Sequence, residues 1–181
     1  MAAHVKEKGL ADYVTQVDIA VQNFLKKELF ALAPDIQFLG EETGLQEMNA
    51  ENFWILDPVD GTTNLMHDYQ HSVVSLALCC QGEIVMGVIY DPFREEVFSA
   101  VKGKGSFLNG QSIYVSNAEK LFDTMIGLGT AKRELADENF ARFRRVFGQC
   151  QDVRRIGSAA LELAYTTCDR QDGYFEIYLN P

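Results

Sequence analysis

The segment that most constrains how this chain folds is residues 53–64, with the sequence FWILDPVDGTTN. Its first four residues are apolar and have the length of a buried strand. They lead directly to Asp57 and Asp60, with Pro58 between them and Gly61 immediately after. Because Pro58 fixes its own φ and Gly61 lets the backbone approach a ligand closely, we predict a rigid, sharp turn that presents both carboxylates at a strand end.

Asp57 and Asp60 would repel each other in a site of low dielectric unless a cation lies between them. Mg²⁺ prefers oxygen ligands and keeps several waters, so two or three carboxylates and a backbone carbonyl, here that of Val59, are sufficient to bind it. The amides of Gly61 and Thr62 are then available to donate to an anion. A solvated turn is the competing interpretation, since Asp, Pro and Gly are all turn formers.

A second acidic cluster follows another short apolar run. Residues 36–39 are predicted to form a strand, and Gly40, Glu41 and Glu42 come directly after it. A solvated pair of glutamates would give the same pattern. Together with the two aspartates of the first segment, however, Glu41 completes a coherent metal site.

The hydrophobic pattern divides the chain into two halves. In the first, apolar residues recur at helical spacing, and strands then follow one another through tight turns such as Asn109-Gly110, which is typical of an antiparallel meander. After Asn117 strands alternate with helices. We predict helices over residues 17–32, 138–147 and 158–168, and strands over residues 72–80, 84–90, 95–101, 113–115, 125–128 and 173–179, with a short strand near residue 153.

Two regions follow from this division. We expect residues 1–117 to form a metal-binding α+β half with the antiparallel sheet. Residues 118–181 are expected to begin an α/β half on the substrate side. No repeat or flexible linker separates them, so we expect the halves to pack tightly as one unit.

Composition limits the classes of function. The chain has 26 acidic and 16 basic residues and a net charge of −10, which repels nucleic acid and anionic lipid, so a phosphate site would require bound cations. We interpret the cluster Arg142, Arg144 and Arg145 as a solvated helix face. No apolar stretch approaches the ~18 residues needed to span a bilayer, and no signal peptide is evident, so we expect a cytoplasmic protein. The four cysteines lack zinc-ligand spacing and are expected to be free thiols.

These motifs resemble those of the inositol monophosphatase family, which comprises magnesium-dependent, lithium-sensitive phosphatases of inositol and sugar phosphates. The family's D-x-V-T-x-x-D, G-E-E and D-P-[IVL]-D-G-T-x-N segments correspond to residues 12–18, 40–42 and 57–64. The likeness continues through residues 102–110 and 154–160 to the strand that holds Glu176, so it covers essentially the whole chain. It implies the layered αβαβα sandwich of the sugar phosphatases and a homodimer.

The resemblance also implies a role for each matching residue. Glu41, Asp57, Asp60 and the Val59 carbonyl would bind Mg²⁺, of which the complete family site holds two or three ions. Asp18 matches an acid near the attacking water, and Thr62 and Glu41 match the pair that orients and activates it. The substrate would contact Asp60, Gly61, Thr62, the loop Gly157, Ser158 and Ala159 at a helix start, and Glu176, which would bind a sugar hydroxyl.

Without the resemblance, the substrate-side residues have simpler interpretations. Ser158 would then be a helix cap and Glu176 a surface strand residue. With it, the implied activity is hydrolysis of inositol monophosphate or a related sugar phosphate by direct attack of a metal-activated water. Two alternatives stay open. One is the same chemistry on fructose bisphosphate, histidinol phosphate or a nucleotide phosphate, and the other is a non-catalytic binding or regulatory protein.

The match to the family breaks at both ends of the sequence. A family helix that precedes the residues matching Val5 is missing or short. The family's W-D-x-A motif, whose aspartate completes the second metal site, would follow the strand of Glu176, but the sequence ends at Pro181. We therefore expect a truncated chain that binds a first Mg²⁺ and hydrolyses sugar phosphates far more slowly than a version extended through that motif.

Overall fold

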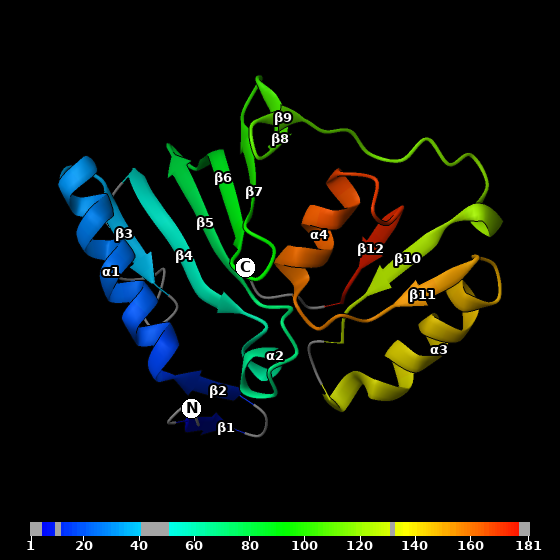
Figure 1. Ribbon diagram of the computed structural model, residues 1–181. Coiled ribbons are helices and arrows are strands. Elements are labelled where there is room, and N and C mark those ends of the chain that lie inside the picture. The colour runs from blue at the N-terminus through cyan, green and yellow to red at the C-terminus, as the bar shows by residue number, and fades with distance from the viewer. Residues whose placement is uncertain (1–4, 10–11, 41–50, 131–132, 178–181) are drawn as a thin grey trace. The chain divides into compact units, whose positions relative to one another are not determined.

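The computed structural model describes residues 5–9, 12–40, 51–130 and 133–177. It divides into two compact units, Met1–Ser112 and Ile113–Pro181, coloured from blue to green and from green to red in Figure 1. The division falls close to the boundary expected after Asn117. The tight packing of the two halves stays a prediction, and each unit is described by itself below.

Unit 1 is built on a seven-stranded sheet. Its strands lie in chain order, and all neighbours are antiparallel except the first two, which are parallel. The predicted meander is thus confirmed, because short turns join each strand from β5 onward to its neighbour. The strands are β3 (Gln37–Gly40), β4 (Asn52–Asp60), β5 (Val73–Cys80), β6 (Glu83–Asp91), β7 (Glu96–Val101), β8 (Gly105–Leu108) and β9 (Gln111–Ser112).

The last hairpin of this sheet differs from the prediction. Asn109 and Gly110 form its two-residue turn with φ of 48° and 79°, as a turn of the favoured hairpin type requires. That turn fixes the register, with Leu108 opposite Gln111. Pairing therefore begins immediately after Gly110 and ends at Ser112, and the strand expected over residues 113–115 is wrong.

The helix α1 (Gln16–Leu32) lies along the β3–β4 end of the sheet (Figure 1). Its Leu29 is buried, as are Trp54 and Leu56, which alternate along β4 in the period of two that a strand imposes. A hairpin of β1 (Val5–Gly9) and β2 (Asp12–Thr15) precedes α1. The predicted helix over residues 17–32 is confirmed to within one residue.

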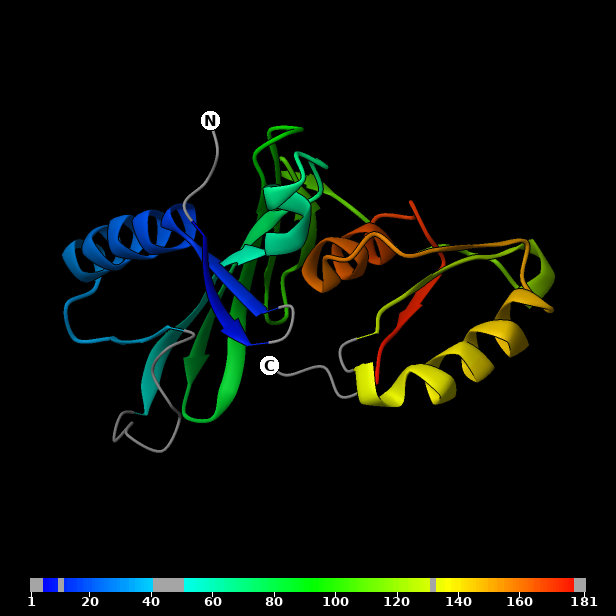
Figure 2. The same ribbon diagram turned by 90° about the horizontal axis from the view of Figure 1, so that it is seen from below.

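Unit 2 is a three-stranded parallel sheet in the order β11 (Asp152–Arg154), β10 (Met125–Leu128) and β12 (Gly173–Phe175). Helix α3 (Ala136–Phe147) joins β10 to β11, and α4 (Ala159–Thr167) joins β11 to β12. These two crossovers run in opposite directions across the sheet. Right-handed connections therefore place the helices on opposite faces, which Figure 2 shows. Two 3₁₀ turns, Leu121–Asp123 and Arg133–Leu135, complete the unit.

The final strand is shorter than predicted. Strand β12 pairs only with β10, and the last pair joins Phe175 to Leu128, where β10 ends. One further bond runs from the amide of Gly129 to the carbonyl of Phe175. Glu176 therefore lies beyond the strand, and the strand expected over residues 173–179 is wrong in its second half, as far as the described residues extend.

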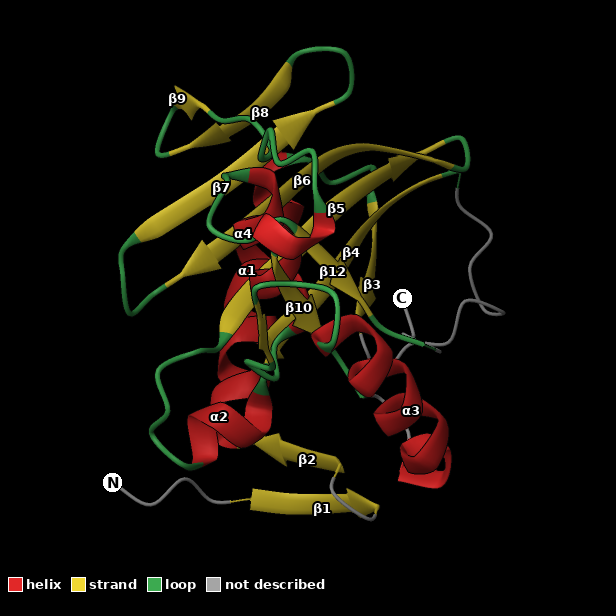
Figure 3. Ribbon diagram, turned by 90° about the vertical axis from the view of Figure 1, so that its right-hand side faces the viewer, coloured by secondary structure: helices red, strands yellow, loops and turns green. Residues whose placement is uncertain are grey.

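Two simpler expectations concern cysteines and membrane helices. All four cysteines are free thiols, as predicted. The helices drawn in red in Figure 3, all from the described part of the chain, include none whose length and apolar character would let it cross a bilayer.

The turn between β6 and β7 depends on one carboxylate. Asp91 is completely buried, and its Oδ1 accepts hydrogen bonds from the amides of Phe93 at 2.9 Å and Arg94 at 3.3 Å. Its Oδ2 pairs with the Arg94 guanidinium at 3.0 Å. The same guanidinium donates to the carbonyl of Gln70 at 3.2 Å, so Asp91 also holds the segment that follows β4 against this turn.

Replacing Asp91 with alanine should lower the free energy of unfolding by about 2–4 kcal/mol, because two backbone amides and the Arg94 guanidinium lose a charged acceptor that lies in the core. The measurement is urea unfolding monitored by circular dichroism. Asp35→Ala, at an exposed turn position, should change stability by less than about 0.5 kcal/mol. Equal effects of the two substitutions would contradict the role assigned to Asp91.

Candidate metal and substrate site

A β-bulge in β4 brings the two aspartates of the DPVDG segment together. Asp57 pairs with Ser75 and Asp60 pairs with Val73, so three steps along β4 match two along β5. In a regular strand, residues three apart point to opposite faces. The extra residue of the bulge offsets this, and because cross-strand partners share a face, Asp57 and Asp60 lie on the same side of the sheet.

The sharp turn predicted at residues 57–60 is wrong, because these residues form a bulge within β4. Strand β4 continues through Pro58 to Asp60, and the chain turns only at Gly61, with φ of 90° and ψ of 38°. Pro58 is tolerated in β4 because pairing with β3 ends at Leu56 and because the bulge interrupts the ladder with β5 that its missing amide would otherwise break. Gly61 is required because this left-handed conformation is costly for residues with a side chain.

Local hydrogen bonds fix the oxygen atoms of this segment. The amide of Val59 donates to Oδ1 of Asp57 at 3.0 Å, and the hydroxyl of Thr62 donates to the Val59 carbonyl at 3.0 Å. The Val59 side chain is 7% exposed, which anchors the bulge in the core. A carbonyl oxygen has two lone pairs, so the Val59 oxygen can accept from Thr62 and still bind a cation.

Hydrogen bonds link the two ends of the segment that follows the bulge, residues 61–72. The short helix α2 (Thr62–Met66) follows Gly61, whose carbonyl accepts from the hydroxyl of Ser72 at 2.8 Å. The side-chain amide of Asn64 donates to the carbonyl of His71 at 2.8 Å. These bonds tie the start of α2 to the start of β5, so Gly61 and Thr62 are held from both ends.

Asp18 lies in the first turn of α1 and is 5% exposed. Strand β2, which leads into α1, packs against both α1 and α2 (Figures 1 and 3). The first turn of α1 and the start of α2 therefore belong to the same region of unit 1. The helix dipole stabilises a carboxylate in the first turn of a helix. An aspartate at this position therefore also stabilises α1, apart from any role at the metal site.

Glu41, the remaining predicted metal ligand, lies outside the described residues. Strand β3 runs parallel to β4 and ends at Gly40, opposite Leu56, so the chain leaves β3 at the edge where Asp57 follows on β4. Within the described ranges, no three His, Cys, Asp or Glu side chains form a group that could hold a metal ion. The described part of the site thus consists of Asp57, Asp60 and the Val59 carbonyl.

The substrate-side residues belong to unit 2 and follow the ends of its parallel strands. Gly157 and Ser158 come after β11, and Glu176 comes after β12. Parallel strands share one carboxyl edge, where sites of α/β sheets usually lie. The buried hydroxyl of Ser158 accepts from the amide of Leu161 at 3.4 Å, which confirms the helix-cap interpretation.

Glu176 lies over the end of the central strand. A Cβ atom added to Gly129 would come within 2.1 Å of the Glu176 carboxyl group and 2.4 Å of the Tyr174 hydroxyl. That hydroxyl donates to Oε2 of Glu176. The absence of a side chain at Gly129 therefore makes room for Glu176, and Tyr174 orients its carboxylate.

Sequence reasoning missed several residues that shape this edge. Glu162 is completely buried, and its Oε1 accepts from the amide of Ile156 at 3.1 Å, which anchors the loop before α4. Arg155 donates to the hydroxyl of Thr130 at 2.8 Å, linking the ends of β11 and β10. The signal that could have pointed to this edge is the GLGT sequence of residues 127–130, which ends the strand over residues 125–128, because glycines at a strand end permit close approach.

Arg154, beside Arg155, is neutralised locally. It donates to Oδ2 of Asp152 at 2.5 Å. This hydrogen bond, with a second from the Val153 amide, lowers the pKa of the Asp152 carboxyl below its usual value, so Asp152 stays ionised near neutral pH. Arg154 therefore pairs with a neighbour within β11, whereas Arg155 reaches Thr130 after the end of β10.

The whole chain, residues 1–181, matches the family model described as the inositol monophosphatase family. The chain is 42% identical over 175 residues to the Nus factor SuhB of Xylella fastidiosa, covering 96% of this chain and 63% of that protein. It is 40% identical over 177 residues to the inositol-1-monophosphatase of Rhizobium meliloti, covering 95% of this chain and 66% of that protein. The chain thus spans about two thirds of the length of these relatives.

Solved structures give the same assignment. The extragenic suppressor protein suhB from Bartonella henselae matches with a TM-score of 0.93 and 38% identity over 98% of this chain and 70% of that one. The IMPase of Thermotoga maritima matches with a TM-score of 0.89 and 30% identity over 98% of this chain and 68% of that one. The layered fold class expected from the sequence is confirmed by these matches. The chain belongs to the inositol monophosphatase family.

Proposed function

We propose that this protein is a Mg²⁺-dependent phosphomonoesterase that hydrolyses inositol monophosphate or a related sugar phosphate. The observation that carries the proposal is the bulge in β4, which places Asp57 and Asp60 on one side of the sheet beside the Val59 carbonyl. In a member of the inositol monophosphatase family, this set of oxygen atoms is best explained as part of a cation site.

The donor set fits magnesium. Two carboxylates and a carbonyl are hard oxygen ligands, which Mg²⁺ prefers, and Glu41 would add a third carboxylate from the end of β3. The number of ions, two or three in the complete family site, stays a prediction. Bound Mg²⁺ would neutralise the charge of the phosphate and lower the pKa of water at the site.

The residues of unit 1 would then prepare the attack on phosphorus. Thr62, held by its bond to the Val59 carbonyl, would orient the attacking water, and Glu41 would accept its proton. Asp18 would add negative charge near that water. The amides of Gly61 and Thr62 would donate to the phosphate, because Gly61 has no side chain to keep a ligand away.

The residues of unit 2 would select the substrate. The loop of Gly157, Ser158 and Ala159 would contact it at the start of α4. Glu176 would accept a hydrogen bond from a sugar hydroxyl, oriented by Tyr174. A carboxylate suits a polyol, since it accepts from hydroxyl donors more strongly than a neutral oxygen does.

The names of the relatives favour a second candidate. The relative from Rhizobium meliloti is named for the phosphatase activity, whereas those from Xylella fastidiosa and Escherichia coli are named Nus factor SuhB. We therefore keep a non-catalytic binding or regulatory role as the alternative. Homodimer formation, lithium sensitivity and a cytoplasmic location also remain predictions.

Removing one carboxylate should weaken Mg²⁺ binding. We expect Asp57→Asn to raise the dissociation constant of Mg²⁺ at least about tenfold, because a full charge in the coordination shell is lost. Isothermal titration calorimetry measures this without any catalytic turnover. Asp35→Asn removes the same charge at an exposed turn and should leave the constant unchanged. The metal site would be refuted by an absence of Mg²⁺ binding, or by equal constants in both variants.

Changing the substrate-side acid should affect recognition of hydroxyl groups. Glu176→Gln should raise the KM for inositol 1-phosphate about tenfold or more, because a charge-assisted hydrogen bond is weakened. The KM for p-nitrophenyl phosphate, which has no sugar hydroxyl, should stay within about twofold of the unmodified protein, since no such bond is lost. Phosphate release measures both values. An equal rise for both substrates would show that Glu176 serves the structure and not the substrate.

A panel of phosphates separates the remaining alternatives. Phosphate release from inositol 1-phosphate, fructose bisphosphate, histidinol phosphate and a nucleotide phosphate would be ranked by kcat/KM, and we expect inositol 1-phosphate to rank first. No release from any of them at saturating Mg²⁺, with the circular dichroism spectrum of a folded protein, would favour the non-catalytic role.

A further inference from the structure

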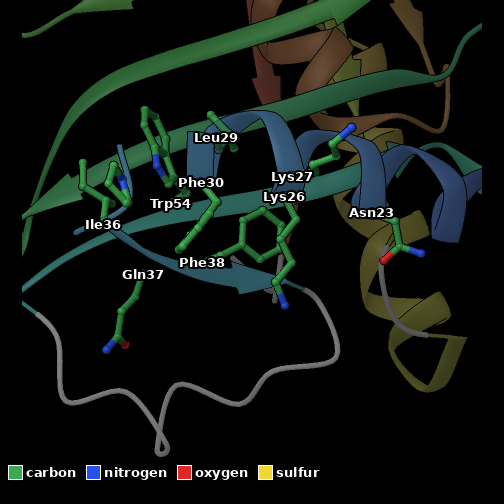
Figure 4. Close-up of a pocket in the computed structure, with 10 residues that line it drawn as sticks. Asn23, Lys26, Lys27, Leu29, Phe30, Ile36, Gln37, Phe38 and Trp54 are labelled. Carbon is green, nitrogen blue, oxygen red and sulfur yellow. The ribbon is translucent and has the colours of Figure 1, made fainter. Parts of the chain in front are cut away.

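A hollow of about 560 Å³ lies in unit 1 between the last turns of α1 and the strands β3 and β4. Figure 4 shows the side chains that line it, among them Lys26, Leu29, Phe30, Phe38 and Trp54. None of the residues assigned to the metal or substrate site lines this hollow. Its volume suits a small organic molecule.

Three of the ten residues that line the hollow are aromatic. Trp54, on β4, is 5% exposed and Leu29 is 8% exposed, so both form a fixed inner wall. Phe38, on β3, is half-buried, and Phe30 is 65% exposed at the rim. Flat apolar groups stack well on such rings, and burial of their surface would drive binding.

The charged residues that line the hollow are basic, whereas the protein as a whole is acidic. Lys26 and Lys27 line it, and the Lys26 ammonium group lies 5.7 Å from the centre of the Phe38 ring. Within the described part of the chain, neither lysine forms an ion pair, and the hollow has no carboxylate in its lining. A chain of net charge −10 therefore presents the Lys26 cation beside the Phe38 ring, whereas the Lys27 side chain points in another direction (Figure 4).

The indole nitrogen of Trp54 is an additional polar group at this wall. It is buried and, within the described residues, has no hydrogen-bond acceptor. Buried donors in native proteins are nearly always paired, because an unpaired one loses its bond to water without replacement. For an acceptor oxygen to reach this nitrogen, the side chains that cover it would have to move.

We propose that this hollow binds a small aromatic anion. Its ring would stack against Phe38 and Trp54, and its carboxylate, sulfonate or phosphate group would lie near Lys26. An acceptor oxygen would take the free N–H of Trp54. The charge complementarity of Lys26, together with the unpaired indole donor, distinguishes this ligand from a neutral apolar one.

The chain offers a direct probe of the hollow, because Trp54 is its only tryptophan. Titration with 8-anilinonaphthalene-1-sulfonate, an aromatic sulfonate, should quench Trp54 emission and saturate at one dye per chain. The single indole N–H resonance in a ¹⁵N correlation spectrum should shift on binding. Quenching that does not saturate would overturn the proposal, and so would an unmoved indole resonance.

Charge and position are tested with paired variants. The double substitution Lys26→Gln and Lys27→Gln should weaken dye binding about tenfold at low ionic strength, since the Lys26 cation at the sulfonate and a second positive charge on the same helix turn are lost. Lys102→Gln with Lys104→Gln makes the same change of charge at an exposed turn of unit 1 and should leave binding unchanged. Equal affinities of the two double variants would overturn the proposed anion site.

A neutral ligand gives the remaining control. N-phenyl-1-naphthylamine has the rings of the dye without the sulfonate and should bind more weakly. Its affinity should be the same for the unmodified protein and the lysine variants. Equal binding of both compounds would show an apolar surface with no preference for anions. If sedimentation shows that chains self-associate and that association excludes the dye, the hollow is a contact between copies and the proposal fails.

Discussion

The β-bulge at residues 57–60 is the constraint on which the candidate site of unit 1 depends. Without the extra residue, Asp57 and Asp60 would face opposite sides of the sheet and could not share a cation. The bulge also explains the presence of Pro58 in a strand that pairs with β5 on either side of it. Gly61 then turns the chain away from the sheet, and Thr62 bonds back to the Val59 carbonyl. One irregularity thus sets the position of every described oxygen atom in the proposed metal site.

Unit 2 brings its candidate site residues together with regular strands and without a bulge. Its three parallel strands end at one edge, so residues far apart in the sequence meet there without any irregularity. Gly129 at the end of β10 leaves space for Glu176 beyond β12, and Glu162 anchors the loop beyond β11. The two units therefore follow separate physical rules: a bulge brings carboxylates to one face in unit 1, and shared strand ends gather the residues proposed to bind substrate in unit 2.

Much of the fold could be predicted, because local patterns decide it. The spacing of apolar residues indicated α1, and the Asn109-Gly110 turn indicated a hairpin. The errors occurred where pairing partners decide the outcome. Strand β12 stops at Phe175 because β10 has ended, and β9 stops at Ser112 soon after its turn. A single strand carries no information about where its neighbour ends.

The sequence by itself determined the family of this protein and the chemical types available at its site, since the acidic motifs and their order are explicit in it. Only the tertiary structure decided how those groups are arranged. The bulge depends on the register of β4 against β5, and the space above Gly129 depends on the pairing of β10 with β12. Both are contacts between segments distant along the chain, and hydrogen bonding between strands fixes them once the sheets have formed.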